Sequence, residues 1–193
     1  MRLICLALLP FLALPTQAAD HEDNFSVKGA GLADCRTYVE ARDQRSQAYF
    51  QFGGWINGYF SALNQTSEET YDLVPWQSTE FLAAALYNWC ANRPDQRFIN
   101  AAAALANRLK EQRLTERSEF VEVETEGKSV RIFRGVIRQA QNRLAELGYF
   151  VGPATGSFDD ATRDALRAFQ AAESLEKTGL PDEATLLRLF YQT

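Results

Sequence analysis

The sequence predicts a mainly α-helical protein built from two helical units, and three observations lead to this fold class. Apolar residues recur at the spacing of amphipathic helices through most of the chain after residue 31. Alternation of apolar and polar residues is confined to the stretch 120–133, and Cys35 and Cys90 fall in different predicted helices. We therefore expect a disulfide-linked four-helix N-terminal bundle (20–114), a short β-hairpin or extended linker (115–133) and a three-helix C-terminal domain (134–193).

The first nineteen residues have the pattern of a secretory signal peptide. A positive start at Arg2 precedes an apolar run over residues 3–14 and small residues up to Ala19. The run is too short to span a bilayer, so no stable membrane insertion is expected. The alternative is a buried N-terminal helix. We expect cleavage after Ala18 or Ala19 and a periplasmic location.

Two of the three cysteines remain in the predicted mature chain, because Cys5 lies inside the signal peptide. In an oxidising compartment Cys35 and Cys90 most simply form one disulfide. The competing interpretations are two free buried thiols or a pair of metal ligands. A metal site would lack further ligands, since the lone histidine is His21 near the mature terminus. No metal and no cofactor is expected.

The first two predicted helices span residues 34–44 and 48–64. Asp34 is a favourable N-cap for the first. Gly53, Gly54 and Gly58 interrupt the second at about 1 kcal/mol each relative to alanine. We expect such glycines where another helix packs closely.

A polar loop over 65–75 leads to a third helix near 78–91, which carries Cys90. Pro94 then suits the first turn of a fourth helix, where proline is favoured. The apolar face of that helix is expected to consist of Phe98, Ala101, Ala102, Leu105 and Leu109.

The stretch 115–133 changes character. Residues 120–124 alternate apolar and polar, Glu126–Gly127 can form a turn, and residues 130–133 return. An isolated hairpin is only marginally stable, so this one is expected to pack on a neighbouring domain.

The last three predicted helices are marked by their ends. The first stops at Gly148, a C-cap glycine, and the other two start at Asp159 and Asp182. Each aspartate can accept a hydrogen bond from a backbone N–H two or three residues on, and its charge suits the helix dipole. The two openings, Asp159–Thr162 and Asp182–Thr185, form a short internal repeat at the level of caps.

This C-terminal region resembles the peptidoglycan-binding domain type 1 family along nearly its whole length. It departs from the family at Thr155, where aspartate is usual, and at Asp159, where many members carry glycine. The resemblance is carried by Gln141, Leu147–Gly148–Tyr149, Gly156–Ser157–Phe158, Thr162, Ala165, Phe169–Gln170, Thr178–Gly179, Asp182 and Thr185–Leu186.

The resemblance implies non-covalent binding of peptidoglycan, with Gln141, Tyr149, Asp159 and Gln170 as candidate contacts. The two glutamines are candidates because side-chain amides can pair with the amides of a stem peptide. Tyr149, at a helix end, could stack on a sugar or seal the small core.

Charge excludes some partners. The formal net charge is −5 with both signs interspersed, so no nucleic-acid surface is expected and charge does not steer the protein to an anionic wall or membrane. Locally, Arg131, Arg134 and Arg138 could share a face and meet a carboxylate, or form ordinary solvated surface.

The N-terminal region has a looser resemblance. The run Gly54–Asn64, then Trp89–Cys90, Pro94 and an alanine-rich helix, is similar to the small disulfide-bonded periplasmic proteins of the HdeA and Tai-like type. That resemblance implies an acid-stress chaperone or an immunity protein that caps wall amidases. Tight helix packing explains the same pattern equally well. The loop Asn64–Asp72 is the candidate contact for a protein partner.

No catalytic motif is present. The sequence holds no Gly–x–Ser–x–Gly, no His–Glu–x–x–His and no cysteine with a usable histidine. Adjacent carboxylates such as Glu68–Glu69 or Asp159–Asp160 cannot flank a glycosidic bond. We therefore expect a non-enzymatic exported protein that binds peptidoglycan and presents an N-terminal interaction domain. The alternatives are an immunity or inhibitor protein against a wall hydrolase, an acid-stress chaperone, a scaffold without wall binding, or a hydrolase without a recognisable motif.

Overall fold

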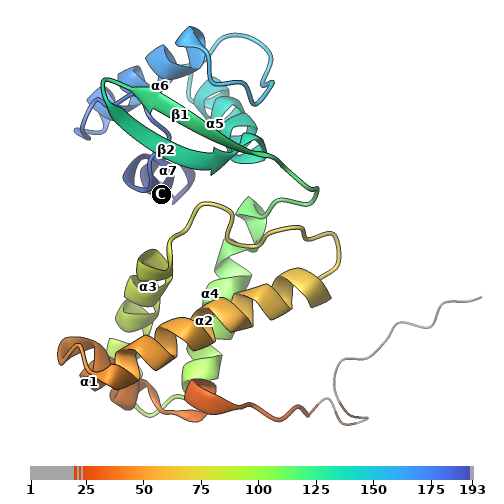
Figure 1. Ribbon diagram of the computed structural model, residues 1–193, viewed down its shortest axis with the longest axis vertical. Helices are drawn as coiled ribbons and strands as arrows, with labels where there is room; N and C mark the ends of the chain where they lie inside the picture. The colour runs from red at the N-terminus through yellow and green to blue at the C-terminus, as the bar shows by residue number, and fades with distance from the viewer. Residues whose placement is uncertain (1–19, 21, 23, 192–193) are drawn as a thin grey trace, which may run out of the picture.

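The computed structural model describes residues 20, 22 and 24–191, and within them the protein is mainly helical. Among these described residues, seven α-helices, two 3-10 helices and one antiparallel hairpin follow one another in two stacked units (Figure 1). The predicted signal peptide, Cys5 and His21 lie outside the described residues.

Four helices form the N-terminal unit: α1 (Cys35–Asp43), α2 (Gln47–Thr66), α3 (Thr79–Ala91) and α4 (Phe98–Leu109). Asp34 caps α1 as predicted, because its carboxylate accepts a hydrogen bond of 2.8 Å from the Thr37 N–H. Ser78 caps α3 in the same way, through a 3.0 Å bond from the Phe81 N–H.

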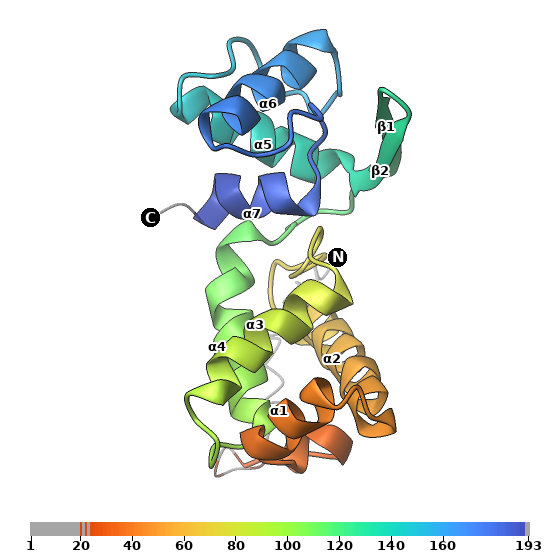
Figure 2. The same cartoon turned by 90° about the vertical axis from the view of Figure 1, so that its left-hand side faces the viewer.

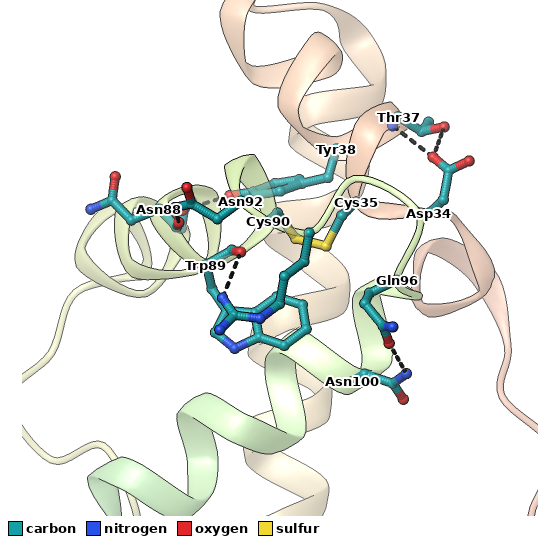
Figure 3. Close-up of a disulfide and its surroundings, with 12 residues drawn as sticks. Asp34, Cys35, Thr37, Tyr38, Asn88, Trp89, Cys90, Asn92, Gln96 and Asn100 are labelled. Atoms are coloured by element: carbon teal, nitrogen blue, oxygen red, sulfur yellow. Dashed lines mark hydrogen bonds between the residues drawn. A yellow bond between two sulfur atoms is a disulfide. The ribbon is translucent and has the colours of Figure 1, made fainter.

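The predicted disulfide between Cys35 and Cys90 is confirmed. It joins the first turn of α1 to the last turn of α3, and both cysteines are fully buried (Figure 3). Beside it Tyr38 packs against Phe98, with ring centroids 4.5 Å apart, and donates its hydroxyl to the Ala83 carbonyl at 2.7 Å. Burial raises the pKa of Tyr38 to about 12, so this hydroxyl stays protonated as a donor.

The prediction for Pro94 is wrong: α4 starts at Phe98, four residues later. The segment before the helix pairs instead with the segment before α1. The Gln96 carbonyl accepts from the Cys35 N–H at 2.8 Å, and the Phe98 N–H donates to the Ala33 carbonyl at 2.9 Å. These pairings hold the segment out of helical geometry.

The expectation that the α2 glycines mark close helix packing is wrong for Gly54 and Gly58, whereas a Cβ at Gly53 would lie 3.9 Å from the Thr79 side chain at the start of α3, an ordinary contact. A Cβ built at Gly54 or Gly58 would meet no atom within 4 Å, because α2 turns its large side chains inward and these glycines outward. The close approach occurs instead at Gly31, in the 3-10 helix η1 (Gly29–Leu32). A Cβ there would lie 2.3 Å from the Trp55 ring.

The stretch after α4 contains a hairpin, as one of the two predicted forms. A second 3-10 helix, η2 (Lys110–Gln112), is followed by β1 (Phe120–Thr125) and β2 (Lys128–Phe133), paired antiparallel with Thr125 opposite Lys128. Positive φ angles at Glu126 and Gly127 suit a two-residue hairpin turn. The hairpin packs on the C-terminal helices as expected, because three of its apolar residues belong to their core. These residues are Val123, Ile132 and Phe133. The exact domain boundaries stay a prediction.

The C-terminal unit contains α5 (Arg134–Glu146), α6 (Asp160–Ala172) and α7 (Glu183–Tyr191). Gly148, with φ of 81°, ends the first of these as predicted, and the following Tyr149 N–H donates to the Leu144 carbonyl at 2.8 Å. Leu144, Phe169 and Leu189 are fully buried at the centre of the three helices.

The two units meet at the loop between α2 and α3, with α7 facing the N-terminal unit (Figure 2). The Glu183 carboxylate accepts from the Ser78 N–H at 2.6 Å and from the Ser78 hydroxyl at 3.1 Å. Nearby, Trp76 packs against Phe190, and the Leu114 N–H donates to the Asp72 carbonyl at 2.8 Å. One unit thus supplies a helix cap to the other.

Replacing Glu183 by alanine should therefore loosen the contact between the units. The substitution removes a charged acceptor at the start of α3, and we expect a loss of about 1–2 kcal/mol. Hydrogen exchange at the Ser78 amide should rise, while Glu146→Ala, which removes an exposed pair with Arg143 on α5, should leave it unchanged. Unaltered protection of Ser78 in the Glu183 variant would contradict this role.

Candidate functional site

Gln141 holds the loop before α6 from inside the C-terminal unit. Its side-chain Nε2 donates to the Ser157 carbonyl at 2.9 Å and to the Thr162 hydroxyl at 2.8 Å. Its Oε1 accepts from the Gly156 N–H at 2.8 Å, and Gly156 has a positive φ of 77°. The amide therefore crosslinks α5, the loop and the first turn of α6.

Gln170 repeats the arrangement one helix later. Its Nε2 donates to the Thr185 hydroxyl at 2.9 Å and to the Leu180 carbonyl at 3.1 Å, and its Oε1 accepts from the Gly179 N–H at 2.7 Å. In both arrangements the glutamine is followed along the chain by the pattern Gly–x–x–Asp–x–x–Thr, which supplies these hydrogen-bonding partners. The internal repeat seen in the caps thus extends to a buried glutamine that binds each cap region.

These contacts correct the prediction that the two glutamines bind a ligand. Gln141 and Gln170 are both 0 % exposed, and both ends of each amide are occupied by hydrogen bonds inside the protein. A ligand would have to displace the loops to reach them. Their role is to hold the fold, since a buried amide must be hydrogen-bonded to be tolerated.

The other two candidates are accessible. Tyr149 is half-buried and packs edge-on against Phe169, with centroids 5.7 Å apart. Asp159 is exposed and caps α6, accepting through Oδ1 from the Thr162 hydroxyl at 2.6 Å and its N–H at 2.9 Å. Their contact with a ligand stays a prediction.

The cap bonds also set the charge of Asp159. The hydrogen bond from the Thr162 hydroxyl, and then that from its N–H, lower the pKa of this carboxyl. Because the pKa of Asp159 is lower in the folded state than in the unfolded state, the ionised carboxylate stabilises the fold at pH values above the unfolded-state pKa. This stabilisation is lost as the pH falls through the folded-state pKa. Asp159 is therefore an anion at neutral pH.

Thr155 explains one departure from the family pattern. Its hydroxyl accepts from the Ser157 N–H, two residues on, at 3.1 Å. Aspartate makes the same kind of turn through its carboxylate, so threonine replaces it without loss of the turn.

A polar groove of about 600 Å³ lies beside this loop, and none of the four predicted contacts lines it. We call it the arginine groove; it is formed by residues 113–119, by α5 from Arg134 to Asn142, and by Thr155. Residues 113–119 are fixed to the helix, because the Gly135 N–H donates to the Ser118 hydroxyl at 2.8 Å and the Arg134 N–H to the Glu119 carbonyl at 2.9 Å.

The opposite wall of the groove is also held in place. A Cβ built at Gly156 would lie 2.7 Å from the Arg134 carbonyl oxygen, so the loop after Thr155 rests directly on the backbone of α5. Only a residue without a side chain fits there in this left-handed conformation. The two walls and the helix between them therefore form one preassembled surface.

The three arginines predicted to share a face separate into two places. Arg134 and Arg138, one helical turn apart, both line the arginine groove. Arg131 instead stacks over the Phe120 ring on the hairpin, 4.5 Å from its centroid. The sequence did not identify Arg113 and Arg117 as groove residues, because only the docking of residues 113–119 on α5 brings them there.

A second concavity, of about 650 Å³, is apolar and lies between α3, α4 and α7. Trp89 and Leu105 line it from the N-terminal unit, and Leu187 and Tyr191 from the C-terminal unit. We call it the apolar groove. The loop 64–72, predicted as a partner contact, is not part of it.

Comparison with known proteins gives one family. Residues 134–189 match the family described as "Putative peptidoglycan binding domain", which confirms the resemblance predicted for the C-terminal third of the chain. The match covers α5, α6 and α7 as far as Leu189, and it excludes residues 113–119. No curated protein and no solved structure matches the chain. Among the described residues, no helix is both long and apolar enough to cross a membrane.

Proposed function

We propose that this is an exported, non-catalytic protein that binds peptidoglycan through its C-terminal unit and presents its N-terminal unit to a protein partner. The observation that carries the proposal is the family match over residues 134–189. A peptidoglycan-binding domain and an intramolecular disulfide both fit a location outside the cytoplasm. Export itself rests on the signal peptide predicted from the sequence.

The arginine groove is the best candidate for the wall contact. It is concave and preassembled, and it offers charged and amide side chains on a module in which Gln141 and Gln170 are buried. Tyr149 and Asp159 remain accessible outside this groove as further candidate contacts.

The apolar groove supports an interaction role for the N-terminal unit. The groove gathers apolar side chains of α3, α4 and α7 around one exposed concavity of about 650 Å³, which offers a contact for an apolar segment of a protein partner. The groove lies mainly on α3 and α4, so a protein bound there and a wall polymer bound at the arginine groove would use different residues.

Sedimentation with purified sacculi tests the wall-binding proposal. The whole protein, purified after export, should pellet with sacculi and be released by soluble wall fragments. Leu105→Ser, in the apolar groove, is a control that should bind sacculi as the wild type does. A folded wild-type protein that stays in the supernatant at high concentration would refute the proposal.

A further inference from the structure

Three arginines of the arginine groove have no partner within the part of the chain that the structure describes. Arg117, Arg134 and Arg138 make no ion pair and donate no side-chain hydrogen bond there. Elsewhere six arginines pair with a carboxylate at 4.0 Å or less. All three groove arginines are exposed, and two lie in the first turns of α5, where the helix dipole also favours an anion.

The groove also contains carboxylates that the arginines leave unpaired. Glu116 and Glu119 line it and form no ion pair among the described residues. Counting Arg113, four arginines face two glutamates, so the groove is locally positive on a protein whose net charge is −5. Such a mixed surface matches a ligand that carries both signs with an excess of negative charge.

The size of the groove suits a short peptide. Its volume of about 600 Å³ falls within the usual range of small-molecule sites. Asn142 and Thr155 supply neutral hydrogen-bonding groups between the charged ones, which suits the amides of a peptide backbone. A phosphate group alone would occupy little of this space and would meet repulsion from the two glutamates.

We propose that the arginine groove binds a short peptide that carries at least two free carboxylates and one amine. Arg117, Arg134 and Arg138 receive the carboxylates, and Glu116 and Glu119 receive the amine. Within the proposed function, on which this assignment rests, such a peptide is an uncrosslinked stem of the wall. Because residues 113–119 form one wall of the site, it is complete only when this segment is joined to the matched module.

Binding of a defined peptide tests the assignment. The probe is the tripeptide L-alanyl-γ-D-glutamyl-meso-diaminopimelate, titrated into the whole protein by calorimetry. Arg117→Gln and Arg138→Gln should each weaken binding about tenfold, as expected for loss of one charge-assisted hydrogen bond. Arg138→Lys should weaken it less, since it keeps the charge but loses the bidentate geometry. The matched control is Arg131→Gln, an exposed arginine outside the groove, which should bind as the wild type does.

Three results would overturn the assignment. They are equal binding of the tripeptide with its carboxylates amidated, displacement by inorganic phosphate at equal concentration, and unchanged binding by the Arg117→Gln/Arg138→Gln double variant. The substituted side chains are exposed, and circular dichroism verifies that each variant is folded. Wild-type protein that sediments with sacculi but ignores the tripeptide would refute this inference alone. Protein that binds the tripeptide but not sacculi would refute the proposed function alone.

Discussion

Replacing Gln170 by alanine should lower the free energy of unfolding of the C-terminal unit by roughly 3–5 kcal/mol. The change leaves the Gly179 N–H and the Leu180 carbonyl without their partner and removes a donor to the Thr185 hydroxyl, all in the fully buried centre. Each buried group left unpaired costs about 1–3 kcal/mol, and the lost side-chain volume adds a cavity.

Denaturant unfolding followed by far-ultraviolet circular dichroism measures this loss. Asn142→Ala is the matched control, because it removes an exposed amide from α5 and should change stability by no more than about 0.5 kcal/mol. A Gln170→Ala variant that keeps its stability and loses only its retention on sacculi would reverse the conclusion. Gln170 would then be a ligand contact, as the sequence suggested.

Removing the disulfide should cost the N-terminal unit about 4 kcal/mol in the chain-entropy model, since Cys35 and Cys90 are 55 residues apart. The bond closes most of α1 to α3 into one loop. The double variant Cys35→Ala/Cys90→Ala removes the crosslink without a reducing agent. Alanine is suitable because both cysteines are fully buried and an apolar replacement places no unpaired polar group in the core.

Tryptophan fluorescence isolates the effect of the disulfide on the N-terminal unit. All three tryptophans, at positions 55, 76 and 89, precede residue 115, so their emission follows the helical bundle and its contact with α7. The midpoint of this transition should fall strongly in the double variant. A shift corresponding to less than about 1 kcal/mol would mean that the buried packing around Tyr38, rather than the crosslink, dominates.

The elements that the sequence predicted well are those whose signals are local. Asp34, Asp159 and Asp182 each accept a hydrogen bond from a backbone N–H three residues on, so the cap and its partner lie in one short segment. The turn at Glu126–Gly127 and the helix end at Gly148 are equally local, because each depends on a positive φ. Such signals are readable without knowing what packs against them.

The predictions that failed depend on distant partners. Pro94 suits a helix start, but pairing of residues 96–98 with the segment before α1 keeps it outside the helix. Gln141 and Gln170 carry polar amides that sequence alone places at the surface as readily as in the core, and their partners lie 8 to 21 residues away. The arginine groove likewise depends on the docking of residues 113–119 against α5.

The contact between Ser78 and Glu183 helps to fix the distance between the two units, and therefore between their two grooves. Two domains on a flexible tether search a wide volume, whereas here a helix cap, the Asp72–Leu114 pairing and the Trp76 packing fix one separation. Linked binding sites reinforce each other only when their spacing matches that of their targets. With the C-terminal unit bound to a surface, the apolar groove would lie at a constant distance from that surface. Only protein partners located at this distance would then reach the groove.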